Sequence, residues 1–431
     1  MSGTQPVVVL LAAGVGQRMN SARSKVLHTV GGHTLLRHAV DAAEAIGPAE
    51  LIVVVGYQRD QVRAHLAEIA PGAVIAVQDD PQGTGDAVRV GLAAVAAPSD
   101  DTMVVVMCAD LPMLDGATLR AMMSTHRNDR DAVTVLGLPD DGDDGAYVFD
   151  YVHLQAALKK TANQAHSSLG DVVSSVRLAG GQIGIHAAQD DWVVRGVDDR
   201  AQLASVSAEY NRRVVERWMR AGVTVMDPAT TWIEADVDLN SDVTLLPGTM
   251  LAGATSVAWG ASIGPETTIK DSEIGEQAVI TRSTVELSVV GAGSRVGPYA
   301  RLRPGSQIGR SGIVGPFVET KNVTLGEGSR LGHLVYCGDA TLGDGVDVGA
   351  GVIFANWDST NKAHIHIGAG AVIGAGALII PPAEVAAGAV VPPGATVQPV
   401  PGRQLADEPD AMLGALRELD DETAKRGMEE K

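Results

Sequence analysis

From about Ile233 onward, an aliphatic residue recurs at every sixth position and is usually followed by glycine or another small residue. An amphipathic helix needs apolar residues three or four positions apart, and a half-buried strand needs them two apart, so neither explains this period. A period of six is typical of a left-handed parallel β-helix, in which one aliphatic side chain per flat face points inward and a small residue allows each corner to turn. At about eighteen residues a coil, residues 233–399 predict roughly nine coils. The clearest repeats are Val290, Val296, Leu302 and Ile308; Leu325 and Leu331; Leu342, Val348 and Phe354; and Ile367, Ile373 and Ile379.

The rest of the composition limits what the chain can be. Its 431 residues are too many for one core and predict two or three domains. The net charge of −19 argues against a nucleic acid as partner, because such proteins present basic surfaces. The two cysteines, Cys108 and Cys337, lie far apart in sequence and suit reduced thiols in the cytoplasm. No segment resembles a signal peptide or a membrane helix, so no membrane partner is expected.

The amino-terminal half alternates strand and helix patterns. Continuous apolar runs at Val7–Leu11, Leu51–Val55 and Thr102–Met107 are typical of parallel strands buried on both faces. Helical patterns at Leu35–Ile46 and Asp60–Ile69 lie between them. The alternation predicts a doubly wound α/β domain that binds ligands at the carboxyl ends of its strands.

Two loops of this domain are candidates for phosphate and metal binding. After the first run, Gly14 and Gly16 could cradle a phosphate with backbone N–H groups, or could form an ordinary strand-to-helix turn. Arg18 and Lys25 follow, and these cations make the phosphate interpretation stronger. Asp110, just after the third run, could bind Mg²⁺ through its carboxylate or could cap the next helix.

Together these residues resemble the nucleotidyltransferases that join a nucleoside triphosphate to a sugar 1-phosphate. The chain is most similar to the bifunctional GlmU family, a UDP-N-acetylglucosamine pyrophosphorylase joined to a glucosamine-1-phosphate N-acetyltransferase. The resemblance runs over residues 7–28, 78–85, 108–112 and 196–200. It implies a Rossmann-like domain with Mg²⁺ on Asp110 and Asp198, the latter standing where the family usually has Asn. The implied UTP-binding residues are Leu11, Ala12, Ala13, Gly14, Arg18, Lys25, Gln78, Gly83, Thr84, Asp110 and Asp198.

One departure from the family affects the sugar half of this pocket. Between the strand expected at Ala132–Leu136 and the segment Gly145–Asp150, the family carries additional residues that hold N-acetylglucosamine. Here only the acidic loop Pro139–Asp144 remains, with Asp143 roughly where a sugar-binding Asn would be. We therefore expect uridine nucleotide to bind with Mg²⁺, while release of pyrophosphate is weak or absent.

Four segments that interrupt the repeat match the acetyltransferase half of the family in order and spacing: 301–305, 318–322, 332–336 and 356–362. The resemblance implies that His333 is the general base and that Glu319 orients its imidazole. In isolation His333 would be an ordinary exposed histidine, and Arg303 and Lys321 would be solvated charges. The implied substrate-binding residues are Arg303, Lys321, Tyr336, Asp347, Asn356 and Lys362. The implied acetyl-CoA contacts are Ala350, Asn356, Trp357 and Ala375. Three of the implied site residues differ from the family: Asp347 stands for Asn, Trp357 for Tyr and Ala375 for Ser.

These patterns predict four regions. They are a nucleotidyltransferase domain at 1–199, a linker helix at 200–222, a β-helix acetyltransferase domain at 223–404 and an acidic tail at 405–431. The helix at 200–222 could instead belong to the surface of the first domain. A prism has no deep pocket of its own, so a homotrimer is expected.

Three functions remain open from the sequence. The leading hypothesis is a bifunctional enzyme that uses glucosamine 1-phosphate, acetyl-CoA, UTP and Mg²⁺. The alternatives are an acetyltransferase with a defective pyrophosphorylase domain, and a non-catalytic trimeric scaffold that senses nucleotides. A scaffold has no need of His333 or Lys362, which argues against the last alternative.

Overall fold

The computed structural model describes residues 5–80, 82–96, 98–137, 145–162, 166–356 and 363–399. The chain divides into two compact units, Met1–Tyr210 and Asn211–Lys431. Helix α7 (Arg200–Arg220) begins in the first unit and ends in the second, so the division falls inside the helix expected to link two domains. None of the helices in the described ranges is long and apolar enough to cross a membrane.

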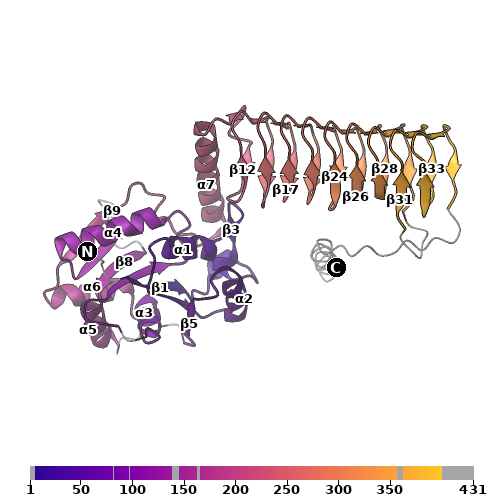
Figure 1. The fold of residues 1–431 in the computed structure, drawn as a ribbon. Coiled ribbons are helices and arrows are strands. Elements are labelled where there is room, and N and C mark those ends of the chain that lie inside the picture. The colour runs from indigo at the N-terminus through magenta and orange to yellow at the C-terminus, as the bar shows by residue number, and fades with distance from the viewer. Residues whose placement is uncertain are drawn as a thin grey trace. The chain divides into compact units, whose positions relative to one another are not determined.

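The first unit is built on a seven-stranded sheet with the order β5-β4-β1-β6-β8-β7-β9 (Figure 1). β1, β4, β5 and β6 are parallel to one another, and the three apolar runs identified in the sequence form β1, β4 and β6. β8 runs antiparallel to both β6 and β7, so the sheet is mixed rather than wholly parallel. The strands are β1 (Val7–Ala12), β4 (Glu50–Val55), β5 (Val74–Val77), β6 (Met103–Cys108), β7 (Val133–Gly137), β8 (Ala146–Asp150) and β9 (Ile183–Ala187), with a small hairpin of β2 (Thr29–Val30) and β3 (His33–Thr34) beside them.

Helices cover both faces of this sheet, as Figure 1 shows. One buried cluster joins Val8 and Leu10 of β1 to helices α1, α2 and α4. A second cluster joins Val7 and Val9, which point to the other face of β1, to α3, α5 and α6. The doubly wound architecture is therefore confirmed. The helices are α1 (Leu35–Glu44), α2 (Arg59–Ile69), α3 (Thr84–Leu92), α4 (Gly116–Asp129), α5 (Tyr151–Thr161) and α6 (Leu169–Leu178).

The second unit is a left-handed parallel β-helix, drawn as a row of coils in Figure 1. A ten-stranded sheet takes one strand from each coil, from β10 (Thr224–Val225) to β35 (Val390–Val391), and a seventeen-stranded sheet forms the other two faces. The described residues thus form nine complete coils, from β10 to β34 (Ala383–Val385), and a tenth that contains only β35 and β36 (Thr396–Val397), in line with the roughly nine expected. The coils used below contain β23 (Arg301–Leu302), β25 (Ile313–Val314), β26 (Glu319–Leu325), β27 (Arg330–Leu331), β28 (Tyr336–Leu342), β29 (Asp347–Val348), β30 (Ile353–Phe354), β31 (Ile365–Ile367) and β32 (Val372–Ile373).

The six-residue period has the physical origin expected from the sequence. Every aliphatic residue and Phe354 in the four repeat series is at most 3% exposed, so these side chains fill the inside of the prism. The small residue that follows lies at a corner where successive coils touch. A Cβ atom on Gly326 would be 2.4 Å from the backbone of Gly343, and one on Gly349 would be 2.6 Å from the nitrogen of Ala375. Glycine therefore allows the corners to stack at strand spacing, about 4.8 Å.

Candidate functional sites

The predicted nucleotide-binding residues come together at the carboxyl edge of the parallel strands. Leu11 and Ala12 end β1, Gln78 follows β5 directly, and Asp110 lies two residues beyond β6. The backbone links these ends, because Ala109 donates to the Leu11 carbonyl at 3.0 Å and Gln78 donates to the Val55 carbonyl at 2.9 Å. This edge is where doubly wound domains bind their ligands.

The glycine loop after β1 makes a turn and also leaves space around it. Gly16 has a left-handed φ of +62°, and a Cβ atom there would lie 2.7 Å from the Cβ of Lys25. Glycine at this position therefore lets Lys25 pack beneath the loop. Gly14 is exposed, and no atom lies within 4 Å of the Cβ it would carry, so a ligand can approach its backbone. The loop is thus both a turn and an open backbone surface suited to phosphate.

Four charged side chains form one cluster beside this loop. The Lys25 ammonium lies 2.5 Å from an oxygen of Asp110 and 3.1 Å from an oxygen of Asp198, and Arg18 contacts the other Asp198 oxygen at 2.9 Å. Burial alone would lower the pKa of Lys25, but the two carboxylates outweigh it and raise that pKa. Burial likewise opposes ionisation of Asp198, yet Lys25 and Arg18 hold its pKa below the ordinary value. Both carboxylates therefore converge on a single cation.

This arrangement suits a metal better than the helix-cap alternative. Helix α4 is capped by Asp115, which accepts from the Thr118 amide at 2.8 Å, whereas Asp110 turns toward Lys25. The cap interpretation of Asp110 is therefore wrong. No group of three or more His, Cys, Asp or Glu side chains within the described ranges could hold a metal. Two hard carboxylates fit Mg²⁺, which usually takes only one or two protein carboxylates and completes its shell with phosphate and water.

Gln78 is buried and held by a residue that was not anticipated. Its Nε2 donates to the Asp86 carboxylate at 2.7 Å and approaches the Gly83 carbonyl at 3.4 Å. Burial opposes ionisation of Asp86, but bonds from Gln78 and Arg89 keep its pKa below the ordinary value. With its amide hydrogens committed in this way, Gln78 presents its carbonyl oxygen as an acceptor. An acid in the first turn after Gly83-Thr84-Gly85 was the available signal for Asp86.

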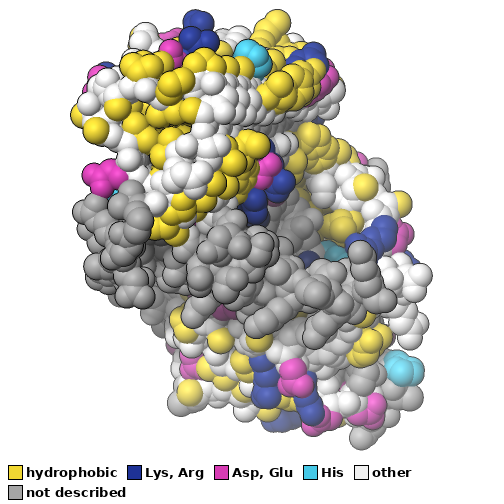
Figure 2. Space-filling model, turned by 90° about the vertical axis from the view of Figure 1, so that its right-hand side faces the viewer, with side chains coloured by type: hydrophobic (Ala, Val, Ile, Leu, Met, Phe, Trp, Pro, Cys, Tyr) yellow, Lys and Arg dark blue, Asp and Glu magenta, His cyan; other side chains and the backbone are white. Residues whose placement is uncertain are grey.

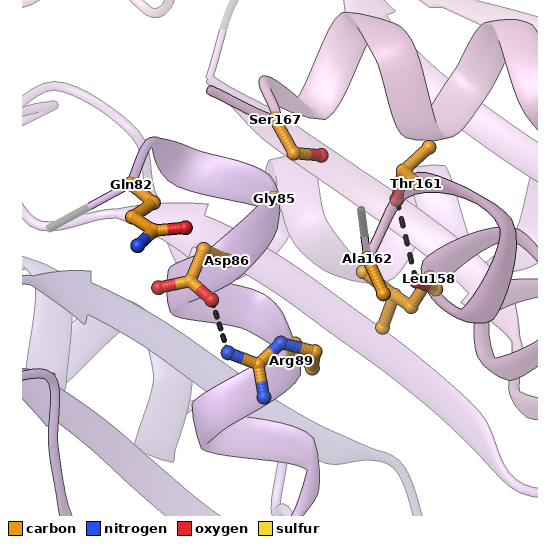
Figure 3. A pocket seen from close by; sticks show the side chains of 8 residues that line it. All are labelled: Gln82, Gly85, Asp86, Arg89, Leu158, Thr161, Ala162 and Ser167. Carbon is orange, nitrogen blue, oxygen red and sulfur yellow. Dashed lines mark hydrogen bonds and ion pairs between the residues drawn. The ribbon is translucent and has the colours of Figure 1, made fainter. Parts of the chain in front are cut away.

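Gly83 and Thr84 are exposed at the start of α3, but part of their surface serves the fold. Thr84 Oγ1 accepts from the Leu169 amide at 2.9 Å, at the start of α6, and a Cβ on Gly83 would be 2.3 Å from the Ser167 carbonyl. Behind them is a small hollow, shown in Figure 3, lined by Gln82, Gly85, Asp86, Arg89, Leu158, Thr161, Ala162 and Ser167. Its volume of about 10 Å³ holds roughly one water and no nucleotide.

In the β-helix, polar residues from successive coils line up on one face. The parallel register pairs Glu319 of β26 with Arg301 of β23 and with Tyr336 of β28, and places Lys321 beside Gly338. Arg303 Nη1 contacts Glu319 Oε1 at 3.0 Å. The described contacts include no bond between Glu319 and His333, so the orienting role of Glu319 stays a prediction.

A chain of hydrogen bonds joins three coils on the same face. The Tyr336 hydroxyl donates to Asn356 Oδ1 at 3.4 Å, and Asn356 Nδ2 donates to Asp339 Oδ2 at 2.5 Å. Asn322 Nδ2 donates to the other Asp339 oxygen at 2.7 Å. Burial raises the pKa of Tyr336, so its hydroxyl stays protonated at neutral pH. Two predicted substrate residues, Tyr336 and Asn356, are thus joined directly, and Asp339, which was not predicted from the sequence, holds Asn356 from its other side.

His333 lies at an exposed corner next to this face, and the predicted acetyl-CoA contacts continue from it. The His333 carbonyl accepts from Gly351 at 3.0 Å, the Ala350 carbonyl accepts from Gly376 at 2.7 Å, and the Ala375 carbonyl accepts from Gly394 at 2.9 Å. His333, Ala350 and Ala375 therefore occupy equivalent positions of successive coils and form one column.

The other predicted residues are placed as follows. Asp347 is exposed at the start of β29, in register with Arg330 on the face of the ten-stranded sheet. Lys321 is half-buried on β26. The predicted site residues Trp357 and Lys362, and the acidic loop with Asp143, lie outside the described residues.

Comparisons with known proteins match the first unit to a domain family and most of the chain to proteins of one name. Residues 8–179 match the model of the MobA-like NTP transferase domain. The protein named bifunctional protein GlmU from Kineococcus radiotolerans is 42% identical over 419 residues, which are 88% of this chain and 85% of that protein. The protein of the same name from Pseudarthrobacter chlorophenolicus is 43% identical over 413 residues, covering 87% of this chain and 84% of that protein. The chain therefore belongs to the bifunctional GlmU family of transferases.

Proposed function

We propose that the chain acetylates glucosamine 1-phosphate with acetyl-CoA on its β-helix and then joins the product to UTP in its first unit, giving UDP-N-acetylglucosamine and pyrophosphate. One observation carries the proposal. The corner residue His333 lies in one column with Ala350 and Ala375, beside the face that bears Arg303 and Tyr336. A base between two sets of binding residues is the arrangement that a two-substrate group transfer needs.

In the acetyl transfer, His333 accepts a proton from the substrate amine. The nitrogen attacks the thioester carbonyl, the carbon–sulfur bond breaks, and coenzyme A leaves as a thiol after taking the proton back from the imidazole. Histidine side chains suit both transfers because they ordinarily titrate near neutral pH. Exposure of His333 at a corner lets both substrates reach it.

The polar face would hold the sugar phosphate. Arg303 and Lys321 supply the positive charge, and charge-assisted bonds to phosphate are among the stronger hydrogen bonds in proteins. Arg303 now pairs with the Glu319 carboxylate, so a phosphate that takes Arg303 would leave Glu319 free for the orienting role that the family resemblance implies. Tyr336 and Asn356 would hold the sugar, together with Lys362.

The small column beside His333 would receive the coenzyme. Ala350 and Ala375 add little bulk at positions that stack at strand spacing, about 4.8 Å per coil. An extended pantetheine arm could therefore follow the corner from coil to coil and bring its thioester to His333. Asn356, Trp357 and Asp347 complete the proposed contacts of the acetyl-transfer site.

In the uridylyl transfer, a phosphate oxygen of N-acetylglucosamine 1-phosphate attacks the α-phosphorus of UTP and pyrophosphate leaves. Catalysis of such a transfer depends on positioning and on neutralising charge. Lys25 and Arg18 would turn from the carboxylates to the phosphates, which frees Asp110 and Asp198 to hold the metal. Mg²⁺, when bound there, neutralises charge on the phosphate oxygens.

The orientation of Gln78 supports uracil as the base. Its amide nitrogen is committed to Asp86 and Gly83, so its carbonyl oxygen faces the ligand. Uracil carries a hydrogen on N3 that can donate to this oxygen, whereas neutral cytosine has only an acceptor there. With CTP, the buried Gln78 oxygen would face an acceptor and stay unpaired, which costs about 1–3 kcal/mol. UTP is therefore favoured over CTP.

A homotrimer would enclose these open faces. Tyr299 and Phe317 stack at 5.1 Å on successive corners and are 53% and 57% exposed, and Leu334 beside His333 is 61% exposed. Hydrophobic side chains also gather at the end of the β-helix seen in Figure 2. Val390 of β35 is 70% exposed. Exposed apolar patches of this kind usually mark an interface. We propose small-molecule substrates as the other partners. We propose the cytoplasm as the location, because thiols such as Cys108 and Cys337 stay reduced there.

Two separate assays test the proposal. The first measures thiol release from acetyl-CoA with glucosamine 1-phosphate, and the second measures pyrophosphate release from UTP, Mg²⁺ and N-acetylglucosamine 1-phosphate. Activity is expected in both, and the shortened segment between β7 and β8 should make pyrophosphate release the weaker of the two. No thiol release would overturn the acetyltransferase assignment, and no pyrophosphate release from a protein that acetylates would restrict the function to the β-helix.

A further inference from the structure

We propose that Asp339 is a positioning residue of the acetyl-transfer site: its carboxylate fixes the side-chain amide of Asn356, and the fixed amide orients the hydroxyl of Tyr336 so that it meets the substrate as a hydrogen-bond acceptor. The inference rests on the proposed acetyl transfer, but it concerns a residue that the family motifs discussed above do not assign.

The geometry at Asp339 leaves one consistent arrangement of donors and acceptors. Asp339 lies at a corner of its coil with a left-handed φ of +46°, between Asn322 on the preceding coil and Asn356 on the following coil. Each of its oxygens accepts from one amide nitrogen, at 2.7 Å and 2.5 Å. An ionised carboxylate only accepts, so both neighbouring amides must turn their NH₂ groups toward it.

The orientation passes from Asn356 to Tyr336. With its nitrogen committed to Asp339, Asn356 must direct Oδ1 the other way, and there it receives the Tyr336 hydroxyl at 3.4 Å. A tyrosine hydroxyl has a single hydrogen, so the side of the oxygen left for the substrate carries lone pairs. The group opposite Tyr336 is therefore a donor, such as a sugar hydroxyl or the amine.

A glycine in the same strand makes room for this contact. A Cβ on Gly338 would lie 2.6 Å from the Tyr336 hydroxyl oxygen and 2.8 Å from Asn356 Nδ2. Any side chain there would separate the two groups. The space above Gly338 is thus an independent observation that β28 is built to bring Tyr336 and Asn356 together.

The first test replaces Asp339 by its isostere. Asp339→Asn supplies one acceptor and one donor, so one of its two neighbouring amides must flip. We expect Asn356 to flip, because the Tyr336 hydroxyl can accept as well as donate and so can face its NH₂. The tyrosine becomes the acceptor of that bond and turns its hydrogen toward the substrate. We expect KM for glucosamine 1-phosphate to rise about tenfold, as for one lost hydrogen bond, with kcat changed less than about twofold.

An exchange variant is the matched control. In Asp339→Asn combined with Asn322→Asp, the new carboxylate at 322 can only accept, so the new amide at 339 donates to it and accepts from Asn356, which keeps its wild-type orientation toward Tyr336. Every group is satisfied, so KM should return to within about threefold of the wild-type value. This variant also carries the test if the single variant fails to fold, as judged by its melting temperature.

A double-mutant cycle separates positioning from a general structural effect. If Asp339 acts through Tyr336, Asp339→Asn should add no further rise in KM in a Tyr336→Phe background. An unchanged KM in the single variant, no recovery in a folded exchange variant, or a full tenfold rise in the phenylalanine background would each overturn the proposal. A wild-type protein that releases no thiol would instead overturn the proposed function, so the two failures are distinguishable.

Discussion

The acetyl transfer proposed for the β-helix depends on one exposed imidazole, that of His333. His333→Ala is expected to lower acetyl transfer by about 10²–10⁴-fold, the usual cost of losing a positioned general base, and to leave the fold intact because the inward side chain of this coil is Leu331. His366→Ala, which changes another exposed histidine of the same solenoid, should keep near-normal activity. Thiol release from acetyl-CoA measures the activity of both variants. A near-normal rate in His333→Ala would show that His333 is not the general base.

The charged cluster of the first unit predicts a dependence of stability on pH. Because Lys25 and Arg18 hold the pKa of Asp198 below its ordinary 3.8, this carboxylate stabilises the fold above that pH and loses its contribution as the pH falls through the lowered value. The melting temperature of the wild type should exceed that of Asp198→Asn at neutral pH, and the difference should shrink below pH 3.8. A difference that grows on acidification would contradict the ion-pair account.

At the scale of elements, the corners of the β-helix determine its tolerance to substitution. Gly326→Ala places a Cβ 2.4 Å from the backbone of the next coil and should cost about 3 kcal/mol, as overpacking does. Gly328→Ala meets no atom within 4 Å, but its φ is +65°, so about 1 kcal/mol of backbone strain is expected. Urea unfolding measures the free energy of unfolding of both variants. If both lose the same amount relative to the wild type, coil stacking does not restrict Gly326.

Local periodicity allowed much of the fold to be predicted. The inward positions from Val290 to Ile379 follow from a six-residue period, and β1, β4 and β6 follow from continuous apolar runs, because burial on both faces acts on each segment alone. The direction of β8 did not follow, since it depends on which strands it pairs with. Asp86 and Asp339 were missed for the same reason: each acts on an amide that only the folded chain brings near.

At the scale of the molecule, the exposed and stacked pair Tyr299 and Phe317 predicts self-association. Light scattering should give the mass of a trimer, and Phe317→Glu should shift the population to smaller species, because a charge would replace a ring that is 57% exposed and apolar. Leu178→Glu, at an exposed apolar position of the first unit, is the control and should stay trimeric. A wild-type monomer that is active at assay concentration would contradict the trimer.

If one chain carries both transferase sites, the two reaction products should appear one after the other. The shortened segment between β7 and β8 is expected to slow the second reaction, since a misplacement of about 1 Å can cost on the order of 10²-fold. The decisive measurement is a mass-spectrometric time course of the full chain with glucosamine 1-phosphate, acetyl-CoA, UTP and Mg²⁺. N-acetylglucosamine 1-phosphate should accumulate first and UDP-N-acetylglucosamine should follow more slowly; a mixture in which glucosamine 1-phosphate persists, or in which no UDP-sugar ever forms, would contradict the account.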